Sequence, residues 1–312
     1  MIDVSVVIVN YNQFSLLDNC LNSIVKHTQE INYEIIVVDN NSSEGDVSKI
    51  TSKYQKVKLI QNKTNNRFSL ANNQGIELAL GKYVLLLNND TLFIENTILI
   101  MKEEIEKYNE PVLIGCKLLN SDYSHQPSVV DFDTIGNLVG EYYFLAKVLP
   151  KVRFLNKYFL SLTSEDKQCE VDVVKGAFMF GRKADFINQN MLDVNFFFYN
   201  EENDYCFRFK LSGGKVIYSP NTSIIHLGGG SSNEMYGWFV IKNLSLSKIK
   251  FFQKHFKGIK FLVAVFIHYS GYLIRVPIYL LGGIFTLKVN LIRKAYYYFR
   301  TIFLYPKNIM IN

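Results

Sequence analysis

The stretch Tyr83–Thr91 (YVLLLNNDT) constrains the fold more than any other segment of the chain. Its unbroken apolar run is typical of a strand that is buried on both faces, as in a parallel sheet. The run passes directly into Asn88, Asn89 and Asp90, so we expect these side chains at the carboxyl edge of the sheet, where open α/β folds bind ligands. One carboxylate flanked by amides suits a divalent cation that keeps coordination positions for phosphate oxygens. A simple Asn/Asp turn at a strand end is the alternative, and this segment alone leaves both open.

Two earlier segments show the same pattern of an apolar run that ends in polar residues. Residues 4–9 (VSVVIV) lead into Asn10-Tyr11-Asn12, and residues 34–38 (EIIVV) lead into Asp39. Apolar residues with helical spacing separate the runs, so strands and helices alternate in units of about 25 to 35 residues. This alternation predicts a doubly wound, mostly parallel α/β sheet. The expected strands are 4–9, 34–38, 57–60 and 83–87, and the expected helices are 15–27, 70–80 and about 95–108.

The alternation breaks down between residues 120 and 170. Pro127, Pro150 and scattered aromatic residues leave weak periodicity there, which predicts a long, partly ordered insertion. Regular structure is expected again after it. The predicted elements are strands at 171–174, 176–180, 216–218 and 223–226 and a helix from about 201 to 213.

Three carboxylates gather at the start of this last helix. Glu201 and Asp204 share one face, whereas Glu202 points about 100° away and is free to face a cleft. Asp204 and Arg208 have the spacing of an i, i+4 ion pair. Negative residues at a helix N-terminus also complement its dipole, which is the simpler interpretation. The preceding apolar run at 196–199 favours a chemical role, because a carboxylate beside an apolar wall has a raised proton affinity and can act as a base.

His226 ends another apolar strand and precedes the loop GGGSS at 228–232. A lone histidine is more often a structural residue than a ligand. The bare backbone amides of a glycine-rich loop, however, can hold phosphate oxygens. Asp39 is similarly ambiguous, since it either caps the turn that follows or binds a nucleotide from the strand end.

The distribution of charge argues against nucleic acid as a partner. The net charge is +6, but residues 236–312 hold 12 of the 34 Lys and Arg residues and none of the 28 Asp and Glu residues, which leaves 22 basic against 28 acidic residues before them. A basic, aromatic and apolar tail fits an anionic membrane surface better. The four cysteines are far apart and no signal segment precedes the first strand, so we expect a cytoplasmic protein with free thiols.

Within the tail, residues 261–287 are mainly apolar, and Arg275 divides them into runs of 14 and 12 residues. Each run is shorter than the roughly 20 residues that a spanning helix needs. Basic residues flank both ends, which opposes a single span under the positive-inside tendency. We therefore expect interfacial or re-entrant helices, peripheral or monotopic, on the cytoplasmic face of the plasma membrane. A soluble helical subdomain is the alternative.

Seven segments in a fixed order carry a family resemblance: VSVVIVNYN, IIVVDN, NNQG, LLLNND, GAFMF, EENDYCFR and IIHLGGGSS. With this order and spacing, the chain resembles a family 2 inverting glycosyltransferase of the glycosyltransferase-A fold. The similarity is to the rhamnosyltransferase-like branch that builds bacterial surface polysaccharides, and it covers residues 2 to about 256. It implies a catalytic domain at 1–235, with a donor half at 1–118, an insertion at 120–170 and an acceptor half at 171–235, followed by a helical membrane-associating region at 236–312.

The resemblance implies roles for single residues in donor binding. Asp39 would recognise the base or ribose of a nucleotide-sugar. Asp90 would end a metal motif that begins at Asn88, and His226 would be the second metal ligand. The full implied set of donor-binding residues is Asn10, Asn12, Asp39, Asn72, Asn88, Asn89, Asp90, Gly229 and Ser231.

The resemblance also implies the chemistry. Glu202 takes the position of the general base, with Glu201 and Asp204 as further catalytic candidates. An acceptor hydroxyl attacks the anomeric carbon while the nucleoside diphosphate leaves, assisted by Mg²⁺ or Mn²⁺. The expected donor is a dTDP- or UDP-sugar that carries rhamnose or a similar hexose. The expected acceptor is a polyprenyl-diphosphate-linked sugar or an oligosaccharide.

Two departures from the family pattern affect this interpretation. Glu202 is one methylene longer than the Asp that is usual there, and Arg67 stands where many relatives have Gly. Two other functions also fit parts of the sequence. A sugar-1-phosphate nucleotidyltransferase would need a Gly-rich, basic loop after the first strand, and residues 10–14 are neither. A non-catalytic membrane scaffold with the same fold would have no need for Asp90, Glu202 and His226 together.

Overall fold

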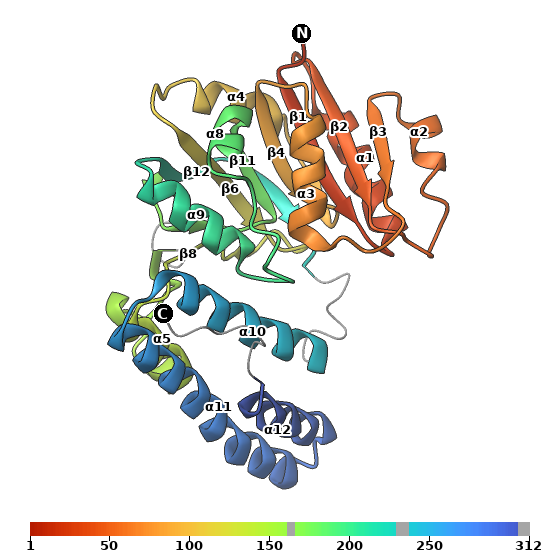
Figure 1. Cartoon of the computed structure of the whole chain (residues 1–312). Coiled ribbons are helices and arrows are strands. Elements are labelled where there is room, and N and C mark those ends of the chain that lie inside the picture. Colours follow the sequence, from red (N-terminus) through yellow and green to blue (C-terminus); the bar gives the residue numbers. More distant parts are fainter. Residues whose placement is uncertain (161–165, 229–236, 305–312) are drawn as a thin grey trace. The chain divides into compact units, whose positions relative to one another are not determined.

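The computed structural model of the chain describes residues 1–160, 166–228 and 237–304 (Figure 1). The chain forms two compact units. The first, here called the sheet unit, comprises Met1–Asp131, Leu160–Asn195 and Glu201–Gly230. The second, the helical unit, comprises Phe132–Phe159, Phe196–Asn200 and Ser231–Asn312. The predicted domain division at residue 235 stays a prediction.

The first half of the sheet unit alternates strands and helices as predicted. Its elements are β1 (Val4–Asn10), α1 (Phe14–His27), β2 (Tyr33–Asp39), α2 (Lys49–Lys53), β3 (Val57–Gln61), α3 (Arg67–Leu78) and β4 (Tyr83–Asn88). β1 pairs in parallel with β2 and β4, and β2 pairs in parallel with β3. In this register Asn10 lies opposite Asp39, and Val9 lies opposite Asn88. The polar residues that follow the apolar runs therefore share one edge of the sheet.

The second half of the unit makes the sheet mixed. The strand order is β3-β2-β1-β4-β11-β6-β12-β5, and β11 is antiparallel to both of its neighbours. Two short strands, β7 and β9, pair with β6 and β12, and β8 and β10 form a separate two-stranded sheet. The elements are β5 (Thr91–Phe93), α4 (Thr97–Ile105), β6 (Val112–Leu119), β7 (His125–Gln126), β8 (Val129–Val130), β9 (Cys169–Glu170), β10 (Val173–Val174), β11 (Phe178–Arg182), α8 (Lys183–Asn188), α9 (Glu201–Leu211) and β12 (Lys215–His226).

One sequence prediction in this half is wrong. The two strands expected at 216–218 and 223–226 are a single strand, β12, which pairs with β6 on both sides of a shift in register between Ser219 and Ser223. Pro220, between the two expected strands, lies in that irregular stretch. A proline is tolerated there because its missing N–H is not required for the ladder.

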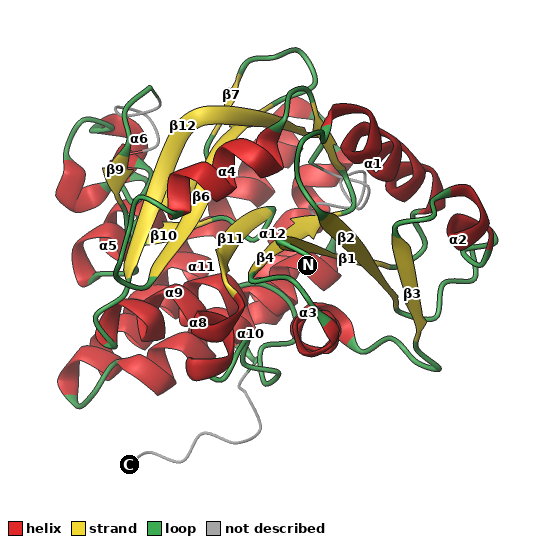
Figure 2. Cartoon of the chain, turned by 90° about the horizontal axis from the view of Figure 1, so that it is seen from above, coloured by secondary structure: helices red, strands yellow, loops and turns green. Residues whose placement is uncertain are grey.

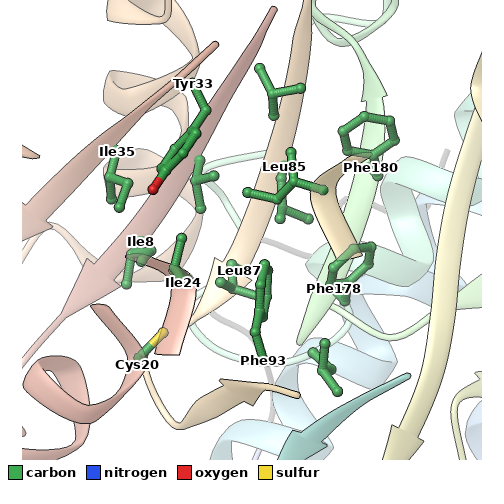
Figure 3. Close-up of a cluster of buried hydrophobic side chains, with 14 of the residues drawn as sticks. Ile8, Cys20, Ile24, Tyr33, Ile35, Leu85, Leu87, Phe93, Phe178 and Phe180 are labelled. Atoms are coloured by element: carbon green, nitrogen blue, oxygen red, sulfur yellow. The ribbon is translucent and has the colours of Figure 1, made fainter. Parts of the chain in front are cut away.

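Helices cover both faces of the sheet, with α1 and α4 on one face and α3, α8 and α9 on the other (Figure 2). Ile8 of β1 and Leu85 of β4 point into a fully buried cluster beside α1 (Figure 3). Val7, on the opposite face of β1, meets α3 so closely that a Cβ added to Gly75 would lie 2.2 Å from a Val7 methyl carbon. The first strand is thus buried on both faces, as its continuous apolar run predicts. All four cysteines are free thiols, as expected.

The helical unit contains six helical segments within the described residues. They are α5 (Ile135–Tyr142), α6 (Leu145–Val148), η1 (Arg153–Leu155), α10 (Trp238–His255), α11 (Ile259–Thr286) and α12 (Val289–Ile302). Three of them belong to the segment that the sequence predicts to be only partly ordered. α5 begins with a capping box, in which the side chains of Thr134 and Asn137 each accept a hydrogen bond from the other's backbone N–H. Only eight residues long, this helix is too short to leave a clear periodic pattern.

α11 corrects the expectation that Arg275 divides the apolar tail into two pieces. The helix runs unbroken for 28 residues through both Arg275 and Pro277. The Arg275 guanidinium donates to the carbonyl oxygens of Tyr142 at 2.7 Å, Gly271 at 3.0 Å and Glu141 at 2.8 Å. Because these carbonyls satisfy its donors, the charged group does not interrupt the helix. By length and composition α11 is long and apolar enough to cross a membrane.

Candidate functional site

The carboxyl edge of the parallel strands carries a connected set of polar side chains. Asn10 Nδ2 donates to Asp39 Oδ1 at 2.9 Å, and Asn89 Nδ2 donates to Asn10 Oδ1 at 2.9 Å. Asp39 also accepts hydrogen bonds from the backbone N–H of Ser42 at 2.9 Å and from its hydroxyl at 2.6 Å. All three of Asn10, Asp39 and Asn89 are buried. The structure therefore brings these three predicted residues together, and their side chains fix the shape of the edge.

Asn12 and Asn72 are held by contacts within the sheet unit. Asn12 has a left-handed backbone, with φ 53°, and its side-chain oxygen accepts hydrogen bonds from the backbone N–H groups of Ser43 at 2.8 Å and Glu44 at 3.3 Å. Asn72 is buried in α3, and its amide donates to the Phe68 carbonyl at 3.0 Å. Their predicted roles in donor binding stay predictions. Two further predicted residues, Gly229 and Ser231, lie outside the described residues.

Asp90 and His226 meet at the same edge of the sheet. Asp90 follows β4, and His226 is the last residue of β12, where it lies opposite Thr91 in an antiparallel pair with β5. The backbone N–H of Leu227 donates to the Asp90 carbonyl at 2.9 Å, which ties the two segments together. Asp90 Oδ1 and His226 Nε2 are 3.3 Å apart. The two residues that the resemblance pairs as metal ligands are thus neighbours in space.

This geometry fits two adjacent ligands of one divalent ion. For metal–ligand bonds of about 2.0 to 2.2 Å, two ligand atoms at a right angle around the metal lie about 3 Å apart. Within the described part of the chain, no cluster of three or more His, Cys, Asp and Glu side chains is placed to hold a metal ion. An ion at Asp90 and His226 would therefore take its other ligands from oxygens of a bound molecule or from water, as Mg²⁺ commonly does.

Gln126 of β7 is part of this site, and the sequence gives no sign of it. Its side-chain oxygen lies 2.6 Å from His226 Nδ1, and its side-chain nitrogen donates to the His226 carbonyl at 3.1 Å. Gln126 is 100 positions from His226 and lies in the segment without periodicity. β7 and β12 both pair with β6, and only this tertiary pairing brings the two residues together.

The three carboxylates at the start of α9 have different surroundings. Glu201 is buried, and its Oε2 has no hydrogen-bond partner among the described residues. Burial raises the pKa of Glu201 well above its usual value, and the nearby Glu202 raises it further. Burial also raises the pKa of Glu202, although a backbone hydrogen bond and Lys175 act in the opposite direction. Asp204 is fully buried and accepts a hydrogen bond from Arg208 Nε at 2.8 Å, which is the predicted ion pair.

Glu202 lies beside Gly176, close to the end of β4. A Cβ added to Gly176 would be 3.8 Å from the Cβ of Glu202 and 3.8 Å from the ring of Phe68. The next residue, Ala177, accepts a hydrogen bond from the backbone N–H of Asn88 at 3.1 Å. This chain of contacts places Glu202 and the edge that carries Asn88 in one region of the sheet unit.

Arg67, the residue that departs from the family pattern, has a left-handed backbone with φ 65°. Glycine adopts this conformation without steric cost, whereas other residues pay roughly 1–2 kcal/mol. The Arg67 carbonyl accepts a hydrogen bond from Asn40 Nδ2 at 3.0 Å, and its N–H donates to Asn65 Oδ1 at 2.8 Å. These bonds hold the loop in a shape that a glycine would adopt readily.

Comparison with known proteins gives a consistent result. A family model described as "Glycosyl transferase family 2" matches residues 5–185. The chain is 35% identical over 108 residues to an "Uncharacterized glycosyltransferase" of Rickettsia felis, and the aligned region covers 34% of this chain and 18% of that protein. It is 24% identical over 233 residues to "Rhamnosyltransferase WbbL" of Escherichia coli, and the aligned region covers 72% of this chain and 83% of that protein. The chain spans less than a fifth of the length of the first curated relatives that it matches.

A solved structure shares the fold. The structure described as "Crystal structure of GalNAc-T7 with UDP, GalNAc and Mn2+" superposes with a TM-score of 0.55 at 16% sequence identity, covering 79% of this chain and 48% of that one. At this level of identity the similarity concerns the fold alone.

Proposed function

This chain belongs to glycosyl transferase family 2, and from that premise we propose that it transfers a sugar from a nucleotide-diphosphate donor to a hydroxyl group of a glycan acceptor in cell-surface polysaccharide synthesis. The observation that carries the proposal is the 3.3 Å approach of Asp90 Oδ1 to His226 Nε2 at the carboxyl edge of the sheet. Ligands of open α/β folds bind at this edge.

In the proposed mechanism, the acceptor oxygen attacks the anomeric carbon as the bond from that carbon to the diphosphate oxygen breaks. A single in-line displacement of this kind inverts the anomeric configuration. Glu202 takes the proton of the attacking hydroxyl, and its raised pKa supports this role because proton affinity increases with pKa. Asp90 and His226 would hold Mg²⁺ or Mn²⁺, which neutralises charge on the leaving diphosphate. Asn10, Asp39 and Asn89 shape the edge against which the nucleotide would bind.

We propose a dTDP- or UDP-sugar as the donor, with rhamnose or a similar hexose as the transferred group. The name of the Escherichia coli relative supports rhamnose, and the GalNAc-T7 structure, which is described as containing UDP and Mn²⁺, supports a metal-assisted nucleotide site. A polyprenyl-diphosphate-linked sugar or an oligosaccharide is the proposed acceptor. Asp204 is engaged with Arg208, so Glu202 is the better candidate for the base.

Donor hydrolysis tests the proposed function. The purified protein is incubated with a panel of dTDP- and UDP-sugars, with Mn²⁺ or with a chelator, and released nucleoside diphosphate is measured. We expect slow release from one donor only when Mn²⁺ is present. The same donor should raise the melting temperature, because a ligand at 100 times its Kd stabilises a protein by about 2.7 kcal/mol. A protein that neither hydrolyses nor is stabilised by any donor would be a scaffold instead.

We also propose that the helical unit binds an anionic membrane surface at the cytoplasmic face of the plasma membrane, as a peripheral or monotopic protein. Exposed apolar side chains recur three and four positions apart along α12, so they form one stripe on that helix. Arg293, Lys294 and Arg300 accompany the stripe, and α12 has no acidic residue, so its charge complements anionic lipid. The stripe residues are Val289, Ile292, Tyr296, Phe299 and Phe303.

Apolar residues of α11 are exposed in the same unit. Leu262, Phe266 and Phe285 are more than half exposed. Only 28% of an apolar stretch of 18 residues in this helix is buried. An amphipathic helix that lies in the membrane interface buries such a face among lipid chains. The exposed apolar faces of α11 and α12 therefore support membrane attachment over a helical unit that is surrounded by water.

A further inference from the structure

We propose that Gln126 is a positioning residue that fixes the tautomer of His226, so that His226 Nε2 faces Asp90 as a lone-pair donor ready to bind a divalent metal ion. This inference deepens the proposed function and rests on it for the metal. In this proposal Gln126 acts on the metal site through the histidine ring.

The orientation of the Gln126 side-chain amide follows from its partners. One end of the amide lies 3.1 Å from the backbone carbonyl of His226 and 3.0 Å from Asn120 Oδ1. A backbone carbonyl only accepts hydrogen bonds, so the end that faces it must be the NH₂ group. Asn120 is oriented in the same way, since its own NH₂ group donates to the His125 carbonyl at 3.3 Å. The oxygen of Gln126 is therefore the atom that lies 2.6 Å from His226 Nδ1.

This orientation determines which ring nitrogen carries hydrogen. The Gln126 oxygen can only accept, so Nδ1 must donate, and the neutral imidazole then has its lone pair on Nε2. That nitrogen lies 3.3 Å from Asp90 Oδ1, which is also an acceptor. A positive charge between the two atoms would favour this arrangement, and either a proton on Nε2 or a divalent ion bound to both atoms would supply it.

The surrounding backbone supports this placement of Gln126. Gly228 has φ 52°, and a Cβ added there would lie 3.5 Å from the Gln126 side-chain nitrogen. The turn after His226 thus packs directly against the amide. Histidine ligands generally donate their second N–H to such a partner, and loss of the partner weakens metal binding about 10- to 100-fold. The amide of Gln126 meets this requirement from a different part of the chain.

Two substitutions of Gln126 and one control test the proposal in the full-length protein. Q126L removes the acceptor for Nδ1–H, whereas Q126E keeps an acceptor there and loses the amide NH₂. Q168L is the matched control, because Gln168 is an exposed residue of the sheet unit whose amide donates to the Tyr108 hydroxyl, away from His226. Melting temperatures without metal show whether each variant is folded.

Nitrogen-15 NMR of His226 without metal, at a pH where the ring is neutral, reads the tautomer directly. We expect Nδ1–H in the parent, in Q168L and in Q126E. In Q126L we expect a shift towards Nε2–H, since Asp90 Oδ1 is then the acceptor that remains. Separate titrations with Mn²⁺ plus UDP and with Mn²⁺ plus dTDP measure metal binding. Q126L should bind Mn²⁺ about 10- to 100-fold more weakly than the parent, and Q126E more tightly than Q126L.

A folded Q126L protein that kept Nδ1–H and bound Mn²⁺ as tightly as Q168L would overturn the proposal. If the unmodified protein bound no Mn²⁺ with either nucleotide, the metal site of the proposed function would itself be wrong. The NMR spectra would still report on Gln126 in that case, so the two failures are distinguishable.

Discussion

Glu202 is one of three carboxylates within four residues, and its surroundings support it as the proposed base. The Glu201 side chain is buried, and that of Asp204 is engaged by Arg208. Glu202 is only partly buried and lies beside Gly176. A base needs both a raised proton affinity and access to its substrate, and the raised pKa and partial exposure of Glu202 support the proposal.

We predict that Glu202→Gln lowers the rate of sugar transfer roughly 10²- to 10⁴-fold, the usual effect of losing a general base. Donor affinity should stay close to that of the parent, because the amide has nearly the same shape. Glu103→Gln, on the exposed surface of α4, serves as the matched control and should transfer at the parental rate. Near-parental transfer by Glu202→Gln would move the base to Glu201 or Asp204.

The pH dependence follows from the same side chain. Burial raises the pKa of Glu202, and the base works only when it is ionised. The transfer rate should therefore fall as the pH drops through this raised pKa, at a higher pH than for an ordinary glutamate. The residual activity of Glu202→Gln should lack this fall. A parental rate that stayed constant down to the usual glutamate pKa would contradict the assignment.

Asp90→Asn and His226→Ala should each weaken the metal-dependent part of donor binding. Each substitution removes one of the two facing ligand atoms, so the remaining group holds the ion less well. Calorimetric titration of the donor with Mn²⁺ and with a chelator separates this part from the rest. Unchanged affinity in Mn²⁺ for both variants would exclude the site.

The sequence draws attention to Asp90 and His226 because each lies at the end of a continuous apolar run. The structure brings the two side chains together, and their role as metal ligands stays a proposal. The sequence does not indicate Gln126, because the contact with His226 depends on the pairing of β7 with β6. It also misses the left-handed backbone of Arg67, since nothing about an arginine predicts φ 65°. The position of a residue at a strand end is thus predictable, whereas a contact that depends on tertiary pairing is not.

At the level of elements, the parallel strands are the most predictable because both of their faces are buried. The errors arise where local signals compete with packing. The sequence predicts two strands at 216–218 and 223–226, yet β12 continues through the residues between them, Pro220 included. Arg275 suggested an interruption, yet carbonyl oxygens of α5 and of its own helix satisfy the guanidinium. In both cases a residue that disfavours the element in isolation is accommodated by a partner that the sequence pattern does not reveal.

The close contact between α3 and β1 predicts that a larger residue at Gly75 destabilises the fold. Gly75→Ala would place a methyl group 2.2 Å from a Val7 methyl carbon, so one of the two elements must move. Overpacking of this kind costs about 1 to 3 kcal/mol, which outweighs a gain in helix propensity of about 1 kcal/mol. In urea denaturation, the Gly75→Ala variant should therefore unfold at a lower urea concentration than the parent.

The double variant Val7→Ala/Gly75→Ala is the control for this contact. Removing the Val7 methyl groups makes space for the new one, so the double variant should be more stable than the sum of the two single effects predicts. Strict additivity would mean that the two residues do not meet as the structure shows.

For the whole molecule, the order of apolar runs predicts the α/β fold. It does not predict which segments of the chain belong to which of the two units. Residues 132–159 join the helical unit although they lie between strands of the sheet unit. Their short helices carry too few residues for a periodic signal.

We predict that I292N/F299N/F303N reduces binding of the full-length protein to vesicles that contain anionic lipid. The substitutions remove apolar area from the α12 stripe, while insertion gains about 0.8 kcal/mol for each buried CH₂. Flotation measures the bound fraction, and high salt should release the parent only in part, because salt screens charge but not apolar burial. The control L78N/L80N/L211N changes three exposed leucines of the sheet unit and should float like the parent. Equal flotation of both triple variants would place the membrane contact elsewhere.

The position of β12 in the sheet affects when the sheet can be completed during synthesis on the ribosome. β12 lies between β6 and β5, although it is the last strand of the sheet in the chain. Asp90 therefore emerges 136 positions ahead of His226, a delay of about 7 to 27 s at typical rates of synthesis. During that time β5 lacks its strand partner, and the proposed metal site lacks half of its protein ligands. If the proposed function is correct, a nascent chain would gain affinity for its sugar donor only after nearly the entire sheet unit has been made.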